Sequence, residues 1–87
     1  MPHLLIHHKV RDLEAWKSAY DAHKPVRDAA GISELYVMQG YEDPNSIVVL
    51  FEAKDIQDIR TFTSSPDLKL AMTRAGVVGT PVILELQ

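Results

Sequence analysis

The stretch from residue 47 to residue 53, IVVLFEA, is the most β-prone in the chain and is apolar on both faces. Alternate residues of a strand point to opposite sides of its sheet. One side therefore carries Ile47, Val49 and Phe51, and the other carries Val48 and Leu50. This pattern is typical of a strand in the middle of a sheet whose two faces are both covered. The rest of the chain has to supply both covers.

Three other stretches are predicted strands. Residues 3–10 mix apolar residues with histidines and carry no helical pattern, and residues 32–39 alternate well enough for a strand. The turn-forming sequence GYEDPNS then predicts a hairpin that joins the second strand to IVVLFEA. The last strand is expected over residues 82–86, after a loop with the sequence VVGTP.

The first helical segment follows the first strand. Asp12 is its expected N-cap, since a short polar side chain there accepts a bond from a free helix N–H. The helix should stop or kink near residues 23–24, because Pro25 lacks a backbone donor and disfavours helical geometry in the residue before it. A further turn over residues 26–30 is expected to end at Gly31.

The second helical segment starts after Asp55 and restarts at Ser65 and Pro66, a cap followed by proline at the first helical position. The order over residues 1–87 is then β-α-β-β-α-β, which predicts one domain of the α+β class. The expected architecture is ferredoxin-like: a four-stranded antiparallel sheet with both helical segments on one face.

Those helices cover only one side of the sheet. On the other side the pattern places Leu5, Val48, Leu50 and alternate residues of the last strand. A monomer would expose this apolar patch, which soluble proteins seldom tolerate. We therefore expect a homodimer that packs sheet face on sheet face.

Composition excludes several classes of protein. The chain has no cysteine, so a disulfide, a zinc–cysteine site and a thiol nucleophile are impossible. A net charge of −3 with dispersed Lys and Arg argues against nucleic-acid binding. No apolar run approaches a membrane span, and the N-terminus does not resemble a signal peptide. We expect a cytoplasmic protein that contacts neither nucleic acid nor membrane.

The candidate site lies on the first helical segment and the first strand. Trp16, Tyr20 and His23 share one helix face, which Arg27 joins if helical phase survives Pro25. His8 lies on the more apolar face of the first strand, the face expected beneath the helices. The two imidazoles are the candidate acid and base at neutral pH, and Arg27 the candidate partner of an anion. The expected pocket wall is formed by Trp16, Tyr20 and Tyr36.

The same residues also fit a packed core without a cavity, in which the histidines bond to each other, to Tyr20 or to the backbone. A metal site is not expected, because His3 and His7 share a strand face but stand about 13 Å apart at about 3.3 Å per residue. A polar cluster in the second helical segment is best explained by helix caps and solvated charge. Its members are Arg60, Ser64, Ser65, Asp67 and Arg74.

Four sequence features together resemble the dimeric α/β-barrel superfamily, and its antibiotic biosynthesis monooxygenase-like branch in particular. They are HHKVRD before the first helix, W-x3-Y-x2-H-x3-R along it, the strand IVVLFEA, and SSPDLKLAMTRAGVVG. The resemblance covers the whole chain and is greatest to short, uncharacterised members. It implies two ferredoxin-like subunits packed sheet on sheet, each with a pocket between sheet and helices.

The resemblance implies either a small cofactor-independent enzyme of the monooxygenase, cyclase or isomerase type, or a non-catalytic dimer that binds a metabolite or has a stress-related role. The enzyme would act on a small aromatic or enolisable compound, with His23 and His8 as its acid and base. Haem-degrading relatives take their iron ligand from a histidine of the second helical segment. This chain has no histidine after His23, so haem is not expected. No other cofactor is expected either, and the chain has neither a P-loop nor a dinucleotide-binding fingerprint. The Asn/Trp/Tyr set of the oxygenases has no counterpart, because Asn45 lies in the predicted turn.

Overall fold

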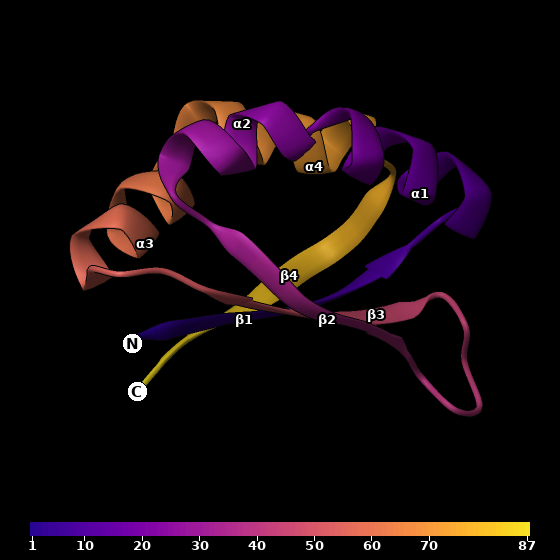
Figure 1. The fold of residues 1–87 in the computed structure, drawn as a ribbon. Coiled ribbons are helices and arrows are strands. Elements are labelled where there is room, and N and C mark those ends of the chain that lie inside the picture. The colour runs from indigo at the N-terminus through magenta and orange to yellow at the C-terminus, as the bar shows by residue number, and fades with distance from the viewer.

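The computed structural model describes residues 1–87, which form one antiparallel sheet with all the helices on one side (Figure 1). In chain order the elements are β1 (His3–Val10), α1 (Leu13–Ala22), α2 (Lys24–Ala30), β2 (Ser33–Gln39), β3 (Ser46–Glu52), α3 (Ile56–Thr63), α4 (Pro66–Arg74) and β4 (Val77–Leu86). The predicted α+β ferredoxin-like fold is confirmed, with each helical segment divided into two short helices.

The helix boundaries follow the predicted caps. The Asp12 side chain accepts a hydrogen bond from the backbone N–H of Glu14 at the start of α1. Helix α1 ends before His23, and α2 begins one residue later with Pro25 in its first turn. Gly31 closes α2 with a φ of 77°, a left-handed conformation that glycine adopts without steric cost. Asp55 and Ser65 cap α3 and α4 in the same way as Asp12 caps α1.

The strand order is β2-β3-β1-β4, so β3 lies inside the sheet, as its two apolar faces predicted. Strands β2 and β3 form the expected hairpin. The buried side of β3 faces the helices and packs with the buried residues of β1 beside it. The core residues at or near complete burial are Leu4, Ile32, Ile47, Val49 and Ile59.

Strand β4 differs from the prediction, because VVGTP is part of the strand and not a loop before it. Val77 pairs with Val10, and Val78 pairs with Lys9. The register then shifts before Val82 pairs with His7. Gly79 has a φ of 72°, which accommodates this bulge. The irregularity leaves His8 without a partner on β4.

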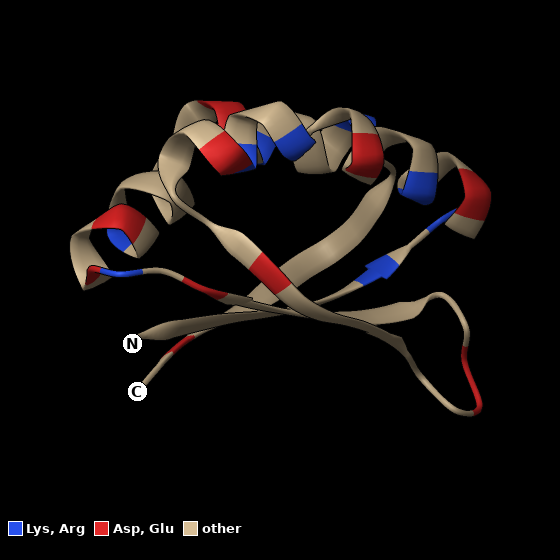
Figure 2. Ribbon diagram, viewed as in Figure 1, with Lys and Arg blue, Asp and Glu red and all other residues tan.

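The sheet face away from the helices is mainly apolar and extends over all four strands. Its apolar members are Leu5, Tyr36, Met38, Val48, Leu50, Val82, Leu84 and Leu86, and the register places His3, His7, Lys9, Ser46 and Glu52 on the same face. Tyr36 is 62% exposed, and Leu84 is 45% exposed. Charged residues concentrate on the helices and toward the strand ends (Figure 2). We call this set the open face.

Candidate functional site

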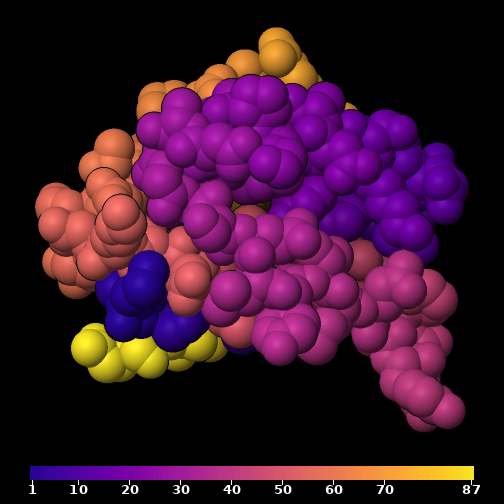
Figure 3. All heavy atoms as spheres, viewed as in Figure 1, coloured from indigo at the N-terminus to yellow at the C-terminus, as the bar shows by residue number.

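A small cavity lies between the helices and the sheet. Of its 15 lining residues 12 are hydrophobic, and they come from α1, α2, α3, α4 and three strands. The cavity has a volume of about 50 Å³. Figure 3 shows the molecule hollowed where α1 and α2 meet β2. The space between helix and sheet is therefore not completely filled by packing.

Five residues predicted for the site line this one cavity: His8, Trp16, Tyr20, His23 and Arg27. Trp16 and Tyr20 form a stacked pair with ring centroids 4.8 Å apart and an interplanar angle of 21°. Trp16 also meets the His8 ring edge-on, at a centroid distance of 5.8 Å. These rings form one wall of the cavity and belong to the core at the same time.

His8 is buried, and neither of its ring nitrogens has a hydrogen-bond partner in the protein. Burial lowers the pKa of His8 below its ordinary value of 6.5, and the neighbouring His7 lowers it further. At neutral pH the imidazole is therefore uncharged, with one nitrogen free to accept a proton. A buried polar group with no partner calls for an explanation, such as a ligand.

His8→Leu is expected to raise the free energy of unfolding by about 1–2 kcal/mol at pH 7, because it removes an unpaired buried polar group. Wild-type protein should also lose stability as the pH falls below about 6.5, because the unfolded histidine takes up a proton before the folded one does. His8→Leu should lack this part of the loss. Urea unfolding at pH 7.5 and pH 5.5 measures both effects. His3→Leu, at the half-buried start of β1, should keep the acid sensitivity. Equal curves for wild type and His8→Leu would contradict the burial of a neutral imidazole.

His23 lies at the break between α1 and α2, where Pro25 ends the first helix. Its Nε2 is buried without a hydrogen bond, and the Asp67 carboxylate lies 3.7 Å from it. No hydrogen bond joins His23 to His8. The two imidazoles therefore face the same cavity without a hydrogen bond between them.

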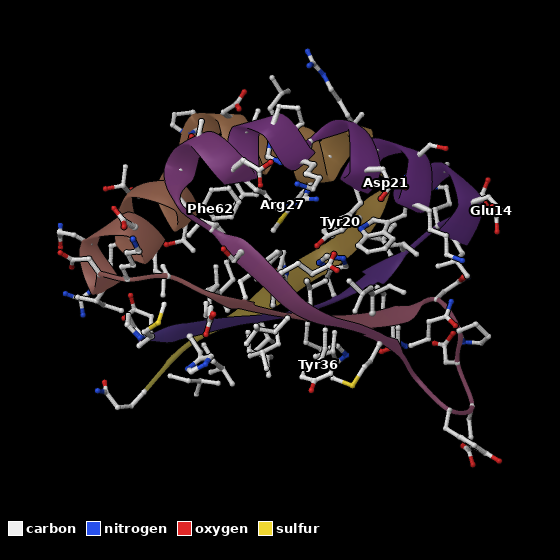
Figure 4. All side chains as sticks on the ribbon, viewed as in Figure 1. Glu14, Tyr20, Asp21, Arg27, Tyr36 and Phe62 are labelled. Atoms are coloured by element: carbon white, nitrogen blue, oxygen red, sulfur yellow. The ribbon has the colours of Figure 1, made fainter.

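The helical phase continues across Pro25, so Arg27 lines the same cavity. Only 5% of Arg27 is exposed. Its Nη1 donates to the backbone oxygen of Tyr20 at 2.8 Å. Its guanidinium carbon lies 3.8 Å from the centre of the Tyr20 ring, a cation–π contact. Figure 4 shows Arg27, Tyr20 and Phe62 together between the helices and the sheet.

Glu34 belongs to the same neighbourhood but was not predicted. The Tyr20 hydroxyl donates to Glu34 Oε1 at 2.7 Å. Burial raises the pKa of Tyr20, and the bond to Glu34 raises it further, so the hydroxyl keeps its proton at neutral pH. The only signal in the sequence was the position of Glu34 on the helix-facing side of β2, opposite Phe51.

Tyr36 is the one predicted site residue that lies elsewhere. It sits on the open face, on the opposite side of the sheet from the cavity (Figure 4). The cause is a register shift: Glu34 pairs with Phe51, but Tyr36 pairs with Leu50, so Leu35 is an extra residue. One inserted residue moves all later side chains of a strand to the other face. The prediction that Tyr36 lines the pocket is therefore wrong.

In the polar cluster of the second helical segment, Ser65 and Arg60 agree with helix capping and solvated charge, whereas Asp67 lies near His23. Ser65 caps α4, and Arg60 forms an exposed ion pair with Glu85 at 3.1 Å. No three His, Asp or Glu side chains converge in the manner of metal ligands. No helix is both long enough and apolar enough to cross a bilayer.

Neither a family model nor a curated protein sequence matches the chain. Solved structures do. A candidate antibiotic biosynthesis monooxygenase from Bordetella bronchiseptica aligns with a TM-score of 0.79 at 12% identity, over 99% of this chain and 94% of that one. The chain has the antibiotic biosynthesis monooxygenase fold.

Two further structures with this fold align almost as well. A candidate antibiotic biosynthesis monooxygenase from Caulobacter crescentus gives a TM-score of 0.76 at 14% identity, over 98% of this chain and 86% of that one. The cofactor-independent oxygenase SnoaB from Streptomyces nogalater gives 0.74 at 16% identity, over 99% and 90%. The predicted resemblance is thus confirmed for the fold, while the site has to be argued from this chain's own residues.

Proposed function

We propose that this protein is a cofactor-independent enzyme that removes a proton from a small enolisable compound. The observation that carries the proposal is His8, an uncharged imidazole with two unpartnered nitrogens at the wall of an apolar cavity. Such a group is a competent general base at neutral pH. The cofactor-independent oxygenase SnoaB shares this fold, so the fold can host an enzyme that uses no cofactor.

Proton removal leaves negative charge on the carbonyl oxygen of the substrate. Arg27 lines the same cavity, and its permanent positive charge stabilises negative charge that develops there. A fixed charge in a site poor in water stabilises a developing oxyanion strongly. The Tyr20 hydroxyl is committed to Glu34 and remains protonated, so it does not compete with His8 as a base. His23 is the candidate for returning the proton, because its Nε2 has no hydrogen-bond partner.

The cavity volume decides between the two expected kinds of substrate. A void of about 150 Å³ holds a benzene molecule. The cavity here measures about 50 Å³, so wall side chains have to move before an aromatic ring fits. A short-chain carbonyl compound is narrower than a ring and requires less movement of the wall. We therefore propose an enolisable substrate in place of an aromatic one.

Deuterium exchange tests the proposal. In D₂O the protein should exchange the methyl protons of pyruvamide or pyruvate at least 100-fold faster than the same concentration of free imidazole, as expected for a positioned base. Proton NMR follows the loss of the methyl signal. A rate equal to that of imidazole would contradict the enzyme. Binding without exchange would instead favour the alternative function, a non-catalytic small-molecule-binding dimer.

The pH profile of this exchange is a second prediction. His8 acts only when neutral, and burial lowers its pKa below 6.5. The rate should therefore be level above pH 6.5 and fall on the acid side, with its midpoint below 6.5. The measurement is the exchange rate between pH 5 and pH 8. A midpoint above 6.5 would assign the base to another residue.

We also propose that the protein works as a homodimer whose subunits pack through their open faces. Eight apolar side chains make up most of this face, and the only acidic or basic residues of β1 and β3, Lys9 and Glu52, lie toward strand ends. The one polar side chain near its centre, His7, is hydrogen-bonded to Ser46 at 2.8 Å. A two-fold axis brings one patch against an identical copy, so an apolar surface without central charges is complementary to itself. The second copy would cover the face that the helices leave bare, while the cavity lies on the other side of the sheet.

A further inference from the structure

We propose that the ligand of this cavity is a small monocarboxylate, with its carboxylate bound by Arg27. The proposal rests on the binding cavity of the proposed function and adds the charge of the molecule that occupies it. It starts from an imbalance of charge: one cation is buried in a cavity lined mainly by apolar groups.

Arg27 has no acidic partner in the protein. No carboxylate oxygen lies within 4.0 Å of its guanidinium, although five other ion pairs form in the chain. A guanidinium has five N–H donors, and only the bond to the Tyr20 backbone oxygen is made within the protein. A charge largely shielded from water and without a counterion is unfavourable, so a bound anion would stabilise it.

The acidic residues nearby in the fold are already engaged. Glu34 accepts the Tyr20 hydroxyl at 2.7 Å, and Asp28 pairs with Lys24 at 2.8 Å. Asp67 lies 3.7 Å from His23. Since none of these carboxylates contacts the Arg27 guanidinium within 4.0 Å, a bound anion can serve as its close counterion.

The charged groups around the cavity limit the ligand to one negative charge. Arg27 is the only permanent cation that lines the cavity, and the lowered pKa of His8 keeps that imidazole neutral at pH 7. A phosphate dianion would therefore bring more charge than the site balances. Carboxylate geometry also matches the planar donors of arginine.

The rest of the lining describes the rest of the ligand. Apolar side chains such as Phe51, Leu68 and Met72 surround the space. The volume of about 50 Å³ is small, so the chain beside the carboxylate has to be short. The unpartnered nitrogens of His8 and His23 can then meet a carbonyl oxygen or an acidic C–H of that chain. A 2-oxo acid of a few carbons combines these features.

The experiment compares pyruvate with pyruvamide, a neutral molecule of nearly the same shape. Trp16, the single tryptophan and part of the cavity wall, reports binding by its fluorescence at constant ionic strength and pH 7.5. Wild-type protein should bind pyruvate at least tenfold more tightly than pyruvamide, and more tightly than inorganic phosphate. Arg27→Gln should abolish the preference for pyruvate, and Arg27→Lys should keep part of it. Arg60→Gln, which removes an arginine outside the cavity, should leave it unchanged.

The outcomes separate this inference from the proposed function. Equal binding of pyruvate and pyruvamide, tighter binding of phosphate, or no binding of either probe would overturn the monocarboxylate. If deuterium exchanges into pyruvamide as fast as into pyruvate, the proposed enzyme would be supported, but the preference for a monocarboxylate would not. A preference for pyruvate without exchange would support the monocarboxylate and remove the enzyme. Arg27 also ties α2 to the end of α1, so if Arg27→Gln does not fold, the wild-type comparison of the two probes decides.

Discussion

Leu50→Glu is expected to convert the proposed homodimer into a monomer, raising the dimer dissociation constant at least a thousandfold. Leu50 lies in the middle of the open face, paired with Leu5 on β1 and with Tyr36 on β2. A glutamate there would be buried without a partner and close to its own copy across the two-fold axis. An unpaired buried charge costs several kcal/mol. Since each 1.4 kcal/mol changes a dissociation constant tenfold, about 4 kcal/mol already gives the expected effect.

Sedimentation velocity at micromolar concentration measures the change in assembly, and circular dichroism checks that the fold is retained. Leu70→Glu is the matched control, because Leu70 is 47% exposed on α4, away from the sheet. That variant should remain a dimer. A monomeric wild-type protein, or a Leu50→Glu variant that stays dimeric, would contradict packing through the open face. The cavity lies on the other side of the sheet, so Leu50→Glu should still bind pyruvate if its subunit stays folded.

Much of the fold could be predicted because the chain marks its own boundaries. Asp12, Asp55 and Ser65 cap helices, and Gly31 ends one, through local bonds that depend on few distant contacts. The apolar pattern of β3 placed that strand inside the sheet. These signals agree with one another, which is the condition for a sequence to specify its fold clearly.

The candidate site was predictable to the extent that simple periodicity holds. The alternation of β1 placed His8 under the helices, and the helical period carried Arg27 to the same space across Pro25. Periodicity fails where a strand gains a residue. The insertion at Leu35 turns Tyr36 to the open face and leaves Glu34 to bond with Tyr20. No residue type announces that insertion, because it depends on pairing with a distant strand.

The bulge on β4 was hidden for a related reason. Gly79 and Pro81 indicate a loop when read locally. In the structure the neighbouring valines pair with β1 on either side of them, and the interruption falls opposite His8. Bulges are common beside active sites, where they leave room around a side chain. The failed prediction and the candidate base therefore lie at the same point of the sheet.

His8→Leu is expected to slow deuterium exchange by about 10²–10⁴-fold, the usual contribution of a general base. Leucine fills a similar space on the apolar wall but cannot accept a proton. The same substitution is predicted above to stabilise the fold, since it removes two unpartnered buried nitrogens. A variant that is more stable and less active would show that the chain keeps an unfavourable group for its chemistry.

The matched control is His3→Leu, which removes a histidine from the other face and the far end of β1. It should exchange at the wild-type rate, because His3 pairs with Glu52 at 3.7 Å and does not line the cavity. The exchange rate of each variant has to be measured with pyruvamide as well as pyruvate, so that loss of the base is distinguished from loss of binding at Arg27. If the His8→Leu variant exchanges protons as fast as wild type, His8 is not the base. His23, the other imidazole at the cavity wall, is then the candidate. If the His8→Leu variant is both slower and less stable than wild type, the unpartnered nitrogens of His8 do not destabilise the fold. His8 then serves to support the cavity wall beside Trp16.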